Sequence, residues 1–164
     1  MVVLQSDGAK YRNVTFSAGL PFTGKSHGAN CADLFGDGRL SIIVASGGLY
    51  PGDLMTSAVF CPKERTGNYL NVRLAGVNCN RDAIGARITL LTGDTRQMRE
   101  VGGGANFGCL PTEQHFGLGN MTEITALEIR WPGGHLQRVE NPPVNATIRI
   151  VESEPGFKVR QEPG

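Results

Sequence analysis

The sequence predicts an all-β protein, in which an antiparallel β-sandwich or barrel-like domain follows a smaller β unit. Its clearest segment spans residues 124–135, where Leu127, Ile129 and Trp131 alternate with charged residues. This is the two-residue period of a strand with one face in water. The 23 glycines and nine prolines lie between short apolar runs, and no window has the period of an amphipathic helix. Many short strands joined by turns are therefore expected.

The first third of the chain predicts a compact series of short strands. Strands are expected near residues 2–4 and 11–14, and a strand, acidic loop and strand unit covers residues 26–45. Residues 40–45 form an apolar run interrupted only by Ser41, which is typical of a strand buried on both faces. A further strand is expected at residues 55–60. The charged, proline-containing stretch 62–67 is then the best boundary in the chain.

The residues after this boundary predict a second domain whose strands have one buried face. Apolar residues alternate with polar ones around residues 70–74 and 87–90. Gly93-Asp94 predicts a hairpin between residues 87–92 and 96–101, and Pro132-Gly133-Gly134 predicts another between 124–131 and 136–140. A last strand contains Ile148 and Ile150. We therefore divide the chain into units at residues 1–62 and 67–152, followed by a loose tail at 153–164.

Charge and apolar runs disfavour two classes of partner. The 16 Lys and Arg residues nearly balance the 15 Asp and Glu residues without a run of one sign, so no nucleic-acid partner is expected. No stretch approaches the apolar length of a membrane span, so no membrane partner is expected. The first residues also lack the features of a signal peptide, so the chain as written is expected to stay in the cytoplasm.

The four cysteines are widely spaced. Cys31, Cys61, Cys79 and Cys109 form no Cys-x-x-Cys pair, the usual mark of a zinc cluster. We expect four free thiols. The alternatives are two disulfides, in any of three pairings, or a metal or redox site that brings at least three of the thiols together.

Several short motifs, in order, resemble a known family. They are Gly67-Asn68-Tyr69-Leu70, Asn80-Arg81-Asp82-Ala83-Ile84-Gly85-Ala86-Arg87, Arg99-Glu100-Val101, His115-Phe116-Gly117-Leu118-Gly119, Arg130-Trp131-Pro132-Gly133-Gly134 and Glu140-Asn141. Over residues 67–151 the chain resembles the ASPIC/UnbV domain. Residues 4–60 are similar to FG-GAP/VCBS repeats, which form propeller blades in proteins that are usually secreted or extracytoplasmic. The resemblance implies a β domain preceded by one blade-like unit.

A single blade cannot close a propeller. Its strand edges carry unpaired backbone groups, which some other surface must cover. The cover can come from the second domain, from another copy of the chain, or from the rest of a longer protein.

The resemblance implies a candidate calcium loop at residues 33–41. Asp33 and Asp37 stand at ligand positions, Gly38 gives the bend, and Arg39 can offer its carbonyl oxygen. Phe35 and Ser41 replace two of the acidic or amide residues usual at these positions. Bound calcium is thus one interpretation, and a turn in which the aspartates accept their own backbone N–H groups is the other.

Two loops are candidate ligand sites. In the first, Asp82 with Arg81, Arg87 and Asn80 could orient a polar ligand through charge-assisted hydrogen bonds, or could simply stabilise the loop. Ala83 replaces the glycine usual in the family, which disfavours positive φ there. The glycine-rich stretch 102–108 lacks the features of a phosphate loop.

Within that glycine-rich stretch, Phe107 is a candidate contact residue, although a buried Phe is the commoner outcome.

For function we expect a non-catalytic binding or interaction module that needs no cofactor unless calcium is bound. A protein or glycan partner, self-association into a homo-oligomer, or membership of a longer chain all fit this role. Two alternatives stay open. One is a hydrolase-type enzyme with an acid–base pair drawn from Asp82, Glu113 and His115, which requires these side chains to meet in one pocket. The other is a calcium-binding structural module.

Overall fold

A computed structural model describes residues 2–6, 8–48, 50–52, 54–102 and 111–160. The all-β prediction is confirmed, and this part of the chain contains strands and no helix. The strands are β1 (Leu4–Ser6), β2 (Tyr11–Asn13), β3 (Ser26–Asp33), β4 (Leu40–Ser46), β5 (Ala58–Phe60), β6 (Asn68–Ala75), β7 (Arg87–Thr92), β8 (Thr95–Glu100), β9 (Gln114–Gly119), β10 (Ala126–Arg130), β11 (Leu136–Glu140), β12 (Ala146–Val151) and β13 (Lys158–Val159).

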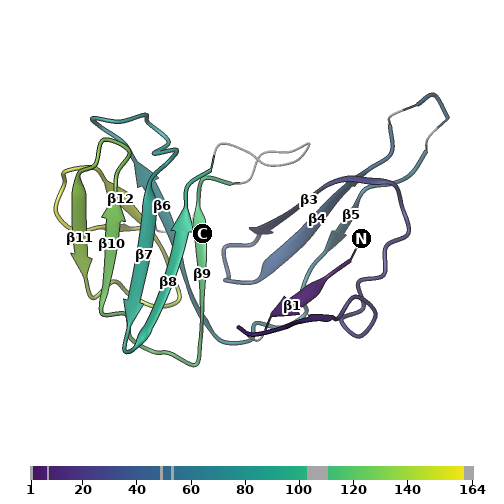
Figure 1. The fold of residues 1–164 in the computed structure, drawn as a ribbon, viewed down its shortest axis with the longest axis horizontal. Coiled ribbons are helices and arrows are strands. Elements are labelled where there is room, and N and C mark those ends of the chain that lie inside the picture. The colour runs from purple at the N-terminus through teal and green to yellow at the C-terminus, as the bar shows by residue number, and fades with distance from the viewer. Residues whose placement is uncertain (1, 7, 49, 53, 103–110, 161–164) are drawn as a thin grey trace.

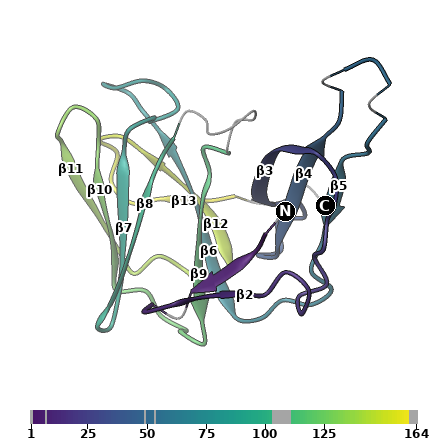
Figure 2. The same ribbon diagram turned by 45° about the vertical axis from the view of Figure 1, so that its right-hand side comes forward.

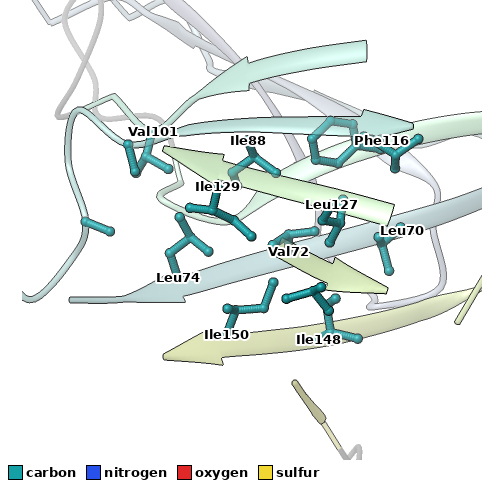
Figure 3. Packing of buried hydrophobic residues seen from close by; sticks show 14 of the residues in the cluster. Leu70, Val72, Leu74, Ile88, Val101, Phe116, Leu127, Ile129, Ile148 and Ile150 are labelled. Carbon is teal, nitrogen blue, oxygen red and sulfur yellow. The ribbon is translucent and has the colours of Figure 1, made fainter. Parts of the chain in front are cut away.

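The second domain is a sandwich of two four-stranded sheets. One sheet has the order β11-β10-β7-β8 and the other the order β13-β12-β6-β9, and the two lie face to face in Figure 1. Strands β6, β7, β9, β10 and β12 place alternate side chains between the sheets. Figure 3 shows how Val72, Leu74, Ile88, Ile129 and Ile150 interdigitate there. This layer is the hydrophobic core of the molecule.

The two hairpins predicted from turn residues are present. Strands β7 and β8 pair from Arg87 with Glu100 to Thr92 with Thr95, so the turn is Gly93-Asp94. Strands β10 and β11 pair antiparallel, and the turn between them is closed by the Trp131 N–H donating to the His135 carbonyl at 2.9 Å. Trp131 is buried on the same side as Leu127 and Ile129, as the alternation predicted.

One pairing departs from the antiparallel expectation. Strands β6 and β12 run parallel, in register from Leu70 with Ala146 to Ala75 with Val151. Parallel neighbours require a long crossover connection. Here that connection contains five strands, β7 to β11, so the two partners lie far apart in the sequence and local patterns did not reveal their direction.

The N-terminal unit is a three-stranded antiparallel sheet, β3-β4-β5, beside the β1-β2 hairpin. It lies to one side of the sandwich (Figure 1). The expectation that β4 is buried on both faces was wrong. Only Ser41 and Val44 are fully covered, while Ile42 and Ile43 are half-buried, because little of the chain packs over this small sheet. The strand expected at residues 55–60 is also shorter, since β5 begins at Ala58.

Within the segment expected to be a tail, Lys158 and Val159 pair with β12 as the edge strand β13 (Figure 2). None of the described residues lies in a helix long and apolar enough to cross a membrane.

Candidate functional site

The two units meet at a polar junction centred on Asp33, the last residue of β3. Its carboxylate accepts the backbone N–H groups of Asp37 at 3.1 Å and Gly38 at 2.8 Å. It also accepts a hydrogen bond of 2.8 Å from Nδ2 of Asn71, which lies on β6 and is almost completely buried. Asp33 therefore joins its own loop to the sandwich.

Asn71 also forms a hydrogen bond with His115. With Nδ2 donating to Asp33, the Asn71 Oδ1 is left to accept from His115 Nδ1 at 2.8 Å. This contact requires the imidazole proton on Nδ1. Asn71 and His115 face each other because β6 and β9 pair antiparallel in this register. The result is a chain of hydrogen bonds from the N-terminal unit across two strands of the sandwich.

Tyr69 closes one side of the junction. Its ring stacks on that of His115, with centroids 6.0 Å apart, and its hydroxyl donates to the Gly36 carbonyl at 3.2 Å. Gly38 lies against this ring with φ of +86°, and a Cβ there would lie 2.2 Å from the ring. Only glycine fits this close approach.

The acidic loop uses its carboxylates for internal bonds. Asp37 accepts Nε of Arg39 at 2.8 Å and the Arg39 backbone N–H at 3.1 Å, and Arg39 in turn donates to the Pro62 and Lys63 carbonyls. Ser41 is fully buried and, by strand alternation, lies on the sheet face opposite to Asp33. Asp33 and Ser41 are therefore not brought together. Calcium binding by Asp33 and Asp37 stays a prediction.

Glu113 and His115 line one hollow together with Cys31 and Asp33, of about 250 Å³. Burial raises the pKa of Glu113 above its usual range, although Arg160 and Arg73 oppose this. Burial lowers the pKa of His115, which Asp33 opposes. Asp82, the third residue of the acid–base hypothesis, lines a different hollow. The structure thus brings two of these three side chains together.

The 80–87 loop is closed by hydrogen bonds of the Asn80 side-chain amide. Asn80 accepts the Ile84 N–H at 2.8 Å and donates to the Ile84 carbonyl at 2.9 Å. The expectation that Ala83 disfavours positive φ was wrong, because Ala83 is buried at φ of +55°. Arg87 pairs with Glu100 at 2.9 Å and lines a different hollow from Asp82.

The remaining candidate residues are Phe107 and the four cysteines. Phe107 and Cys109 lie outside the described residues. Cys31, Cys61 and Cys79 are free thiols. The described residues contain no group of three or more His, Cys, Asp and Glu side chains placed to hold a metal.

Sequence reasoning missed Asn71 and Glu152. Both are buried polar residues. One Glu152 oxygen accepts the backbone N–H groups of Val77, Asn78 and Cys79 at 2.8, 2.7 and 3.0 Å. Asn71 lies between Leu70 and Val72, where the alternation of the strand predicts a solvent-exposed polar residue. The sequence did not indicate that the N-terminal unit covers it. Glu152 had no sequence signal.

Residues 76–156 match the protein-family model described as ASPIC and UnbV. The chain carries an ASPIC/UnbV domain. The match begins after β6, which is an inner strand of the sandwich, so the sandwich extends to Asn68, before the matched residues. We use the name ASPIC/UnbV domain for the whole sandwich. A search of curated proteins found no match.

Proposed function

We propose that the chain is a non-catalytic interaction module, in which the ASPIC/UnbV domain holds the N-terminal unit and that unit associates with a second copy of the chain. The observation that carries the proposal is that one edge of β3 pairs with no other strand in the described part of the chain. This eight-residue strand has β4 as its only strand neighbour among the described residues. Such an edge offers a row of backbone donors and acceptors to another strand.

Natural edge strands usually carry charges or prolines that prevent pairing. Of the two six-residue edge strands in the sandwich, β8 carries Arg96, Arg99 and Glu100, whereas β9 carries no charged residue but lies beside β8 (Figure 1). Unlike β8, β3 has no Lys, Arg or Pro, and its one charged residue is Asp33 at the junction. The contrast between the β3 and β8 edges supports pairing through β3.

The distribution of apolar residues also supports the proposal. Of the twenty buried hydrophobic residues in the described part of the chain, only Val44 precedes the sandwich. The exposed large hydrophobic residues are instead concentrated in the N-terminal unit, with Phe16 at 82% and Leu54 at 91% exposure. A unit with so little core of its own gains stability when a partner covers it.

The FG-GAP-like character of residues 4–60 belongs to this proposal as well. A propeller blade has four strands, whereas the described sheet here has three. A second copy would extend the sheet by strand addition.

The test substitutes Ala29, an exposed residue in the middle of β3, by lysine. Sedimentation velocity should show that Ala29→Lys shifts the chain toward monomer. Met98→Lys introduces the same charge on β8, where Met98 is 57% exposed, and should leave association unchanged. Equal loss in both variants, or association unchanged by Ala29→Lys, would show that β3 is not the contact.

A further inference from the structure

Five cations gather on the outer face of the ASPIC/UnbV domain, beside the docked N-terminal unit. Arg73 on β6 lies in register with Arg149 on β12, which in turn lies in register with Lys158 on β13. Arg160, two residues after Lys158, and Arg81 complete the group, which lines a hollow of about 450 Å³. We call these five residues the basic row.

No member of the basic row forms an ion pair within the described part of the chain, although Asp82 shares the hollow and Glu113 interacts electrostatically with Arg73 and Arg160. All five side chains are exposed. Some other surface arginines are paired, as Arg87 is with Glu100 and Arg138 with Glu128 and Glu140, whereas Arg96 and Arg130 form no ion pair in the described part of the chain. Like charges directly opposite on neighbouring strands destabilise a sheet. Their retention in a chain of net charge +1 points to an external anion.

The lining adds groups that a simple anion site does not need. Asp82 shares the hollow, and so does Thr147. A carboxylate repels sulfate or phosphate but accepts hydrogen bonds from hydroxyl groups, and a threonine hydroxyl can donate or accept. The mixture suits a ligand that carries both anionic groups and hydroxyls.

Spacing favours a saccharide over a peptide. Neighbouring strands lie about 4.8 Å apart, so the basic row repeats on the scale of a single sugar ring. Carboxylates on one side of an extended peptide recur at about 6.7 Å, twice the rise per residue. Among the described residues no aromatic side chain lines the hollow, whereas single-stranded nucleic acids are usually held by stacking on aromatic rings.

We propose that the basic row binds an acidic polysaccharide bearing sulfate or carboxylate groups. It uses a surface separate from the β3 edge, so this binding can succeed or fail independently of self-association. The arginines give charge-assisted hydrogen bonds to the acidic groups, while Asp82 and Thr147 contact hydroxyls.

The test is a calorimetric titration of the full chain with a heparin-type sulfated tetrasaccharide at low and at physiological salt. Arg73→Ala and Arg149→Ala should each weaken binding roughly tenfold, the loss expected for one hydrogen bond to a charged group. Arg96→Ala, an exposed arginine on the opposite sheet, is the control that removes the same charge and should bind like the wild type.

Four outcomes would overturn the proposal. They are absence of binding, equal weakening by Arg96→Ala, binding of inorganic sulfate as tight as that of the tetrasaccharide, and tighter binding of a DNA or polyglutamate oligomer of equal charge. Circular dichroism of each variant establishes that it is folded, and an association state measured in parallel separates this result from the test of β3.

Discussion

At the scale of single residues, the junction between the two units depends on a few side chains that hydrogen-bond or pack across it. Asp33 holds three donors, Asn71 is nearly inaccessible, and Gly38 lies against the Tyr69 ring. Removing one member of such a network leaves a buried polar group unsatisfied, which costs about 1–3 kcal/mol. Even a substitution that removes few atoms at the junction should therefore lower the free energy of unfolding measurably.

Gly38→Ala tests the close approach to Tyr69. Left-handed φ alone costs a residue with a side chain about 1–2 kcal/mol, and the added methyl group also displaces the Tyr69 ring. Gly8→Ala is the matched control, because Gly8 has φ of +93° with no atom within 4 Å of its added Cβ. Denaturant unfolding should show a larger loss for Gly38→Ala, and equal losses would contradict the described contact.

His115 should make stability depend on pH. Burial holds its pKa in the folded protein below the usual 6.5. As the pH falls through 6.5, the unfolded chain takes up a proton that the folded chain resists, so the free energy of unfolding decreases.

Unfolding measured at pH 8 and pH 5.5 should show this decrease, and His115→Gln should reduce it. His135→Gln, at an exposed turn residue, serves as the control. A pH dependence unchanged by His115→Gln would assign the effect to other groups.

At the scale of elements, the basic row predicts strain between strands. Arg149 faces Arg73 on one side and Lys158 on the other. Arg149→Thr should therefore raise the free energy of unfolding by about 0.2–1 kcal/mol at low salt, the usual size of a cross-strand pair. Salt screens the repulsion, so the gain should shrink at 1 M salt. Destabilisation at low salt would contradict the repulsion inferred here.

The elements also show how far sequence patterns reach. Leu127, Ile129 and Trp131 alternate cleanly, and Gly93-Asp94 has the residues of a two-residue turn, so both hairpins could be predicted. The parallel partnership of β6 and β12 could not, because register between distant strands depends on tertiary packing. The same holds for the junction, since Asn71 and Asp33 are 38 residues apart.

At the scale of the whole molecule, core and exposed apolar surface are divided between the two units. The ASPIC/UnbV domain contains the continuous hydrophobic cluster, and the N-terminal unit contains most of the exposed large hydrophobic residues. The junction fixes the N-terminal unit to the ASPIC/UnbV domain, and no other strand among the described residues pairs with the outer edge of β3. This division is what an interaction module requires.

The most direct test is the molar mass of the wild-type chain in solution, measured by light scattering after size exclusion, once in calcium and once in chelator. We predict a stable dimer or larger species in both, with at least twice the 17.5 kDa of one chain. A mass that changes with calcium would implicate Asp33 and Asp37 in metal binding. A monomer in both conditions would contradict self-association through the N-terminal unit.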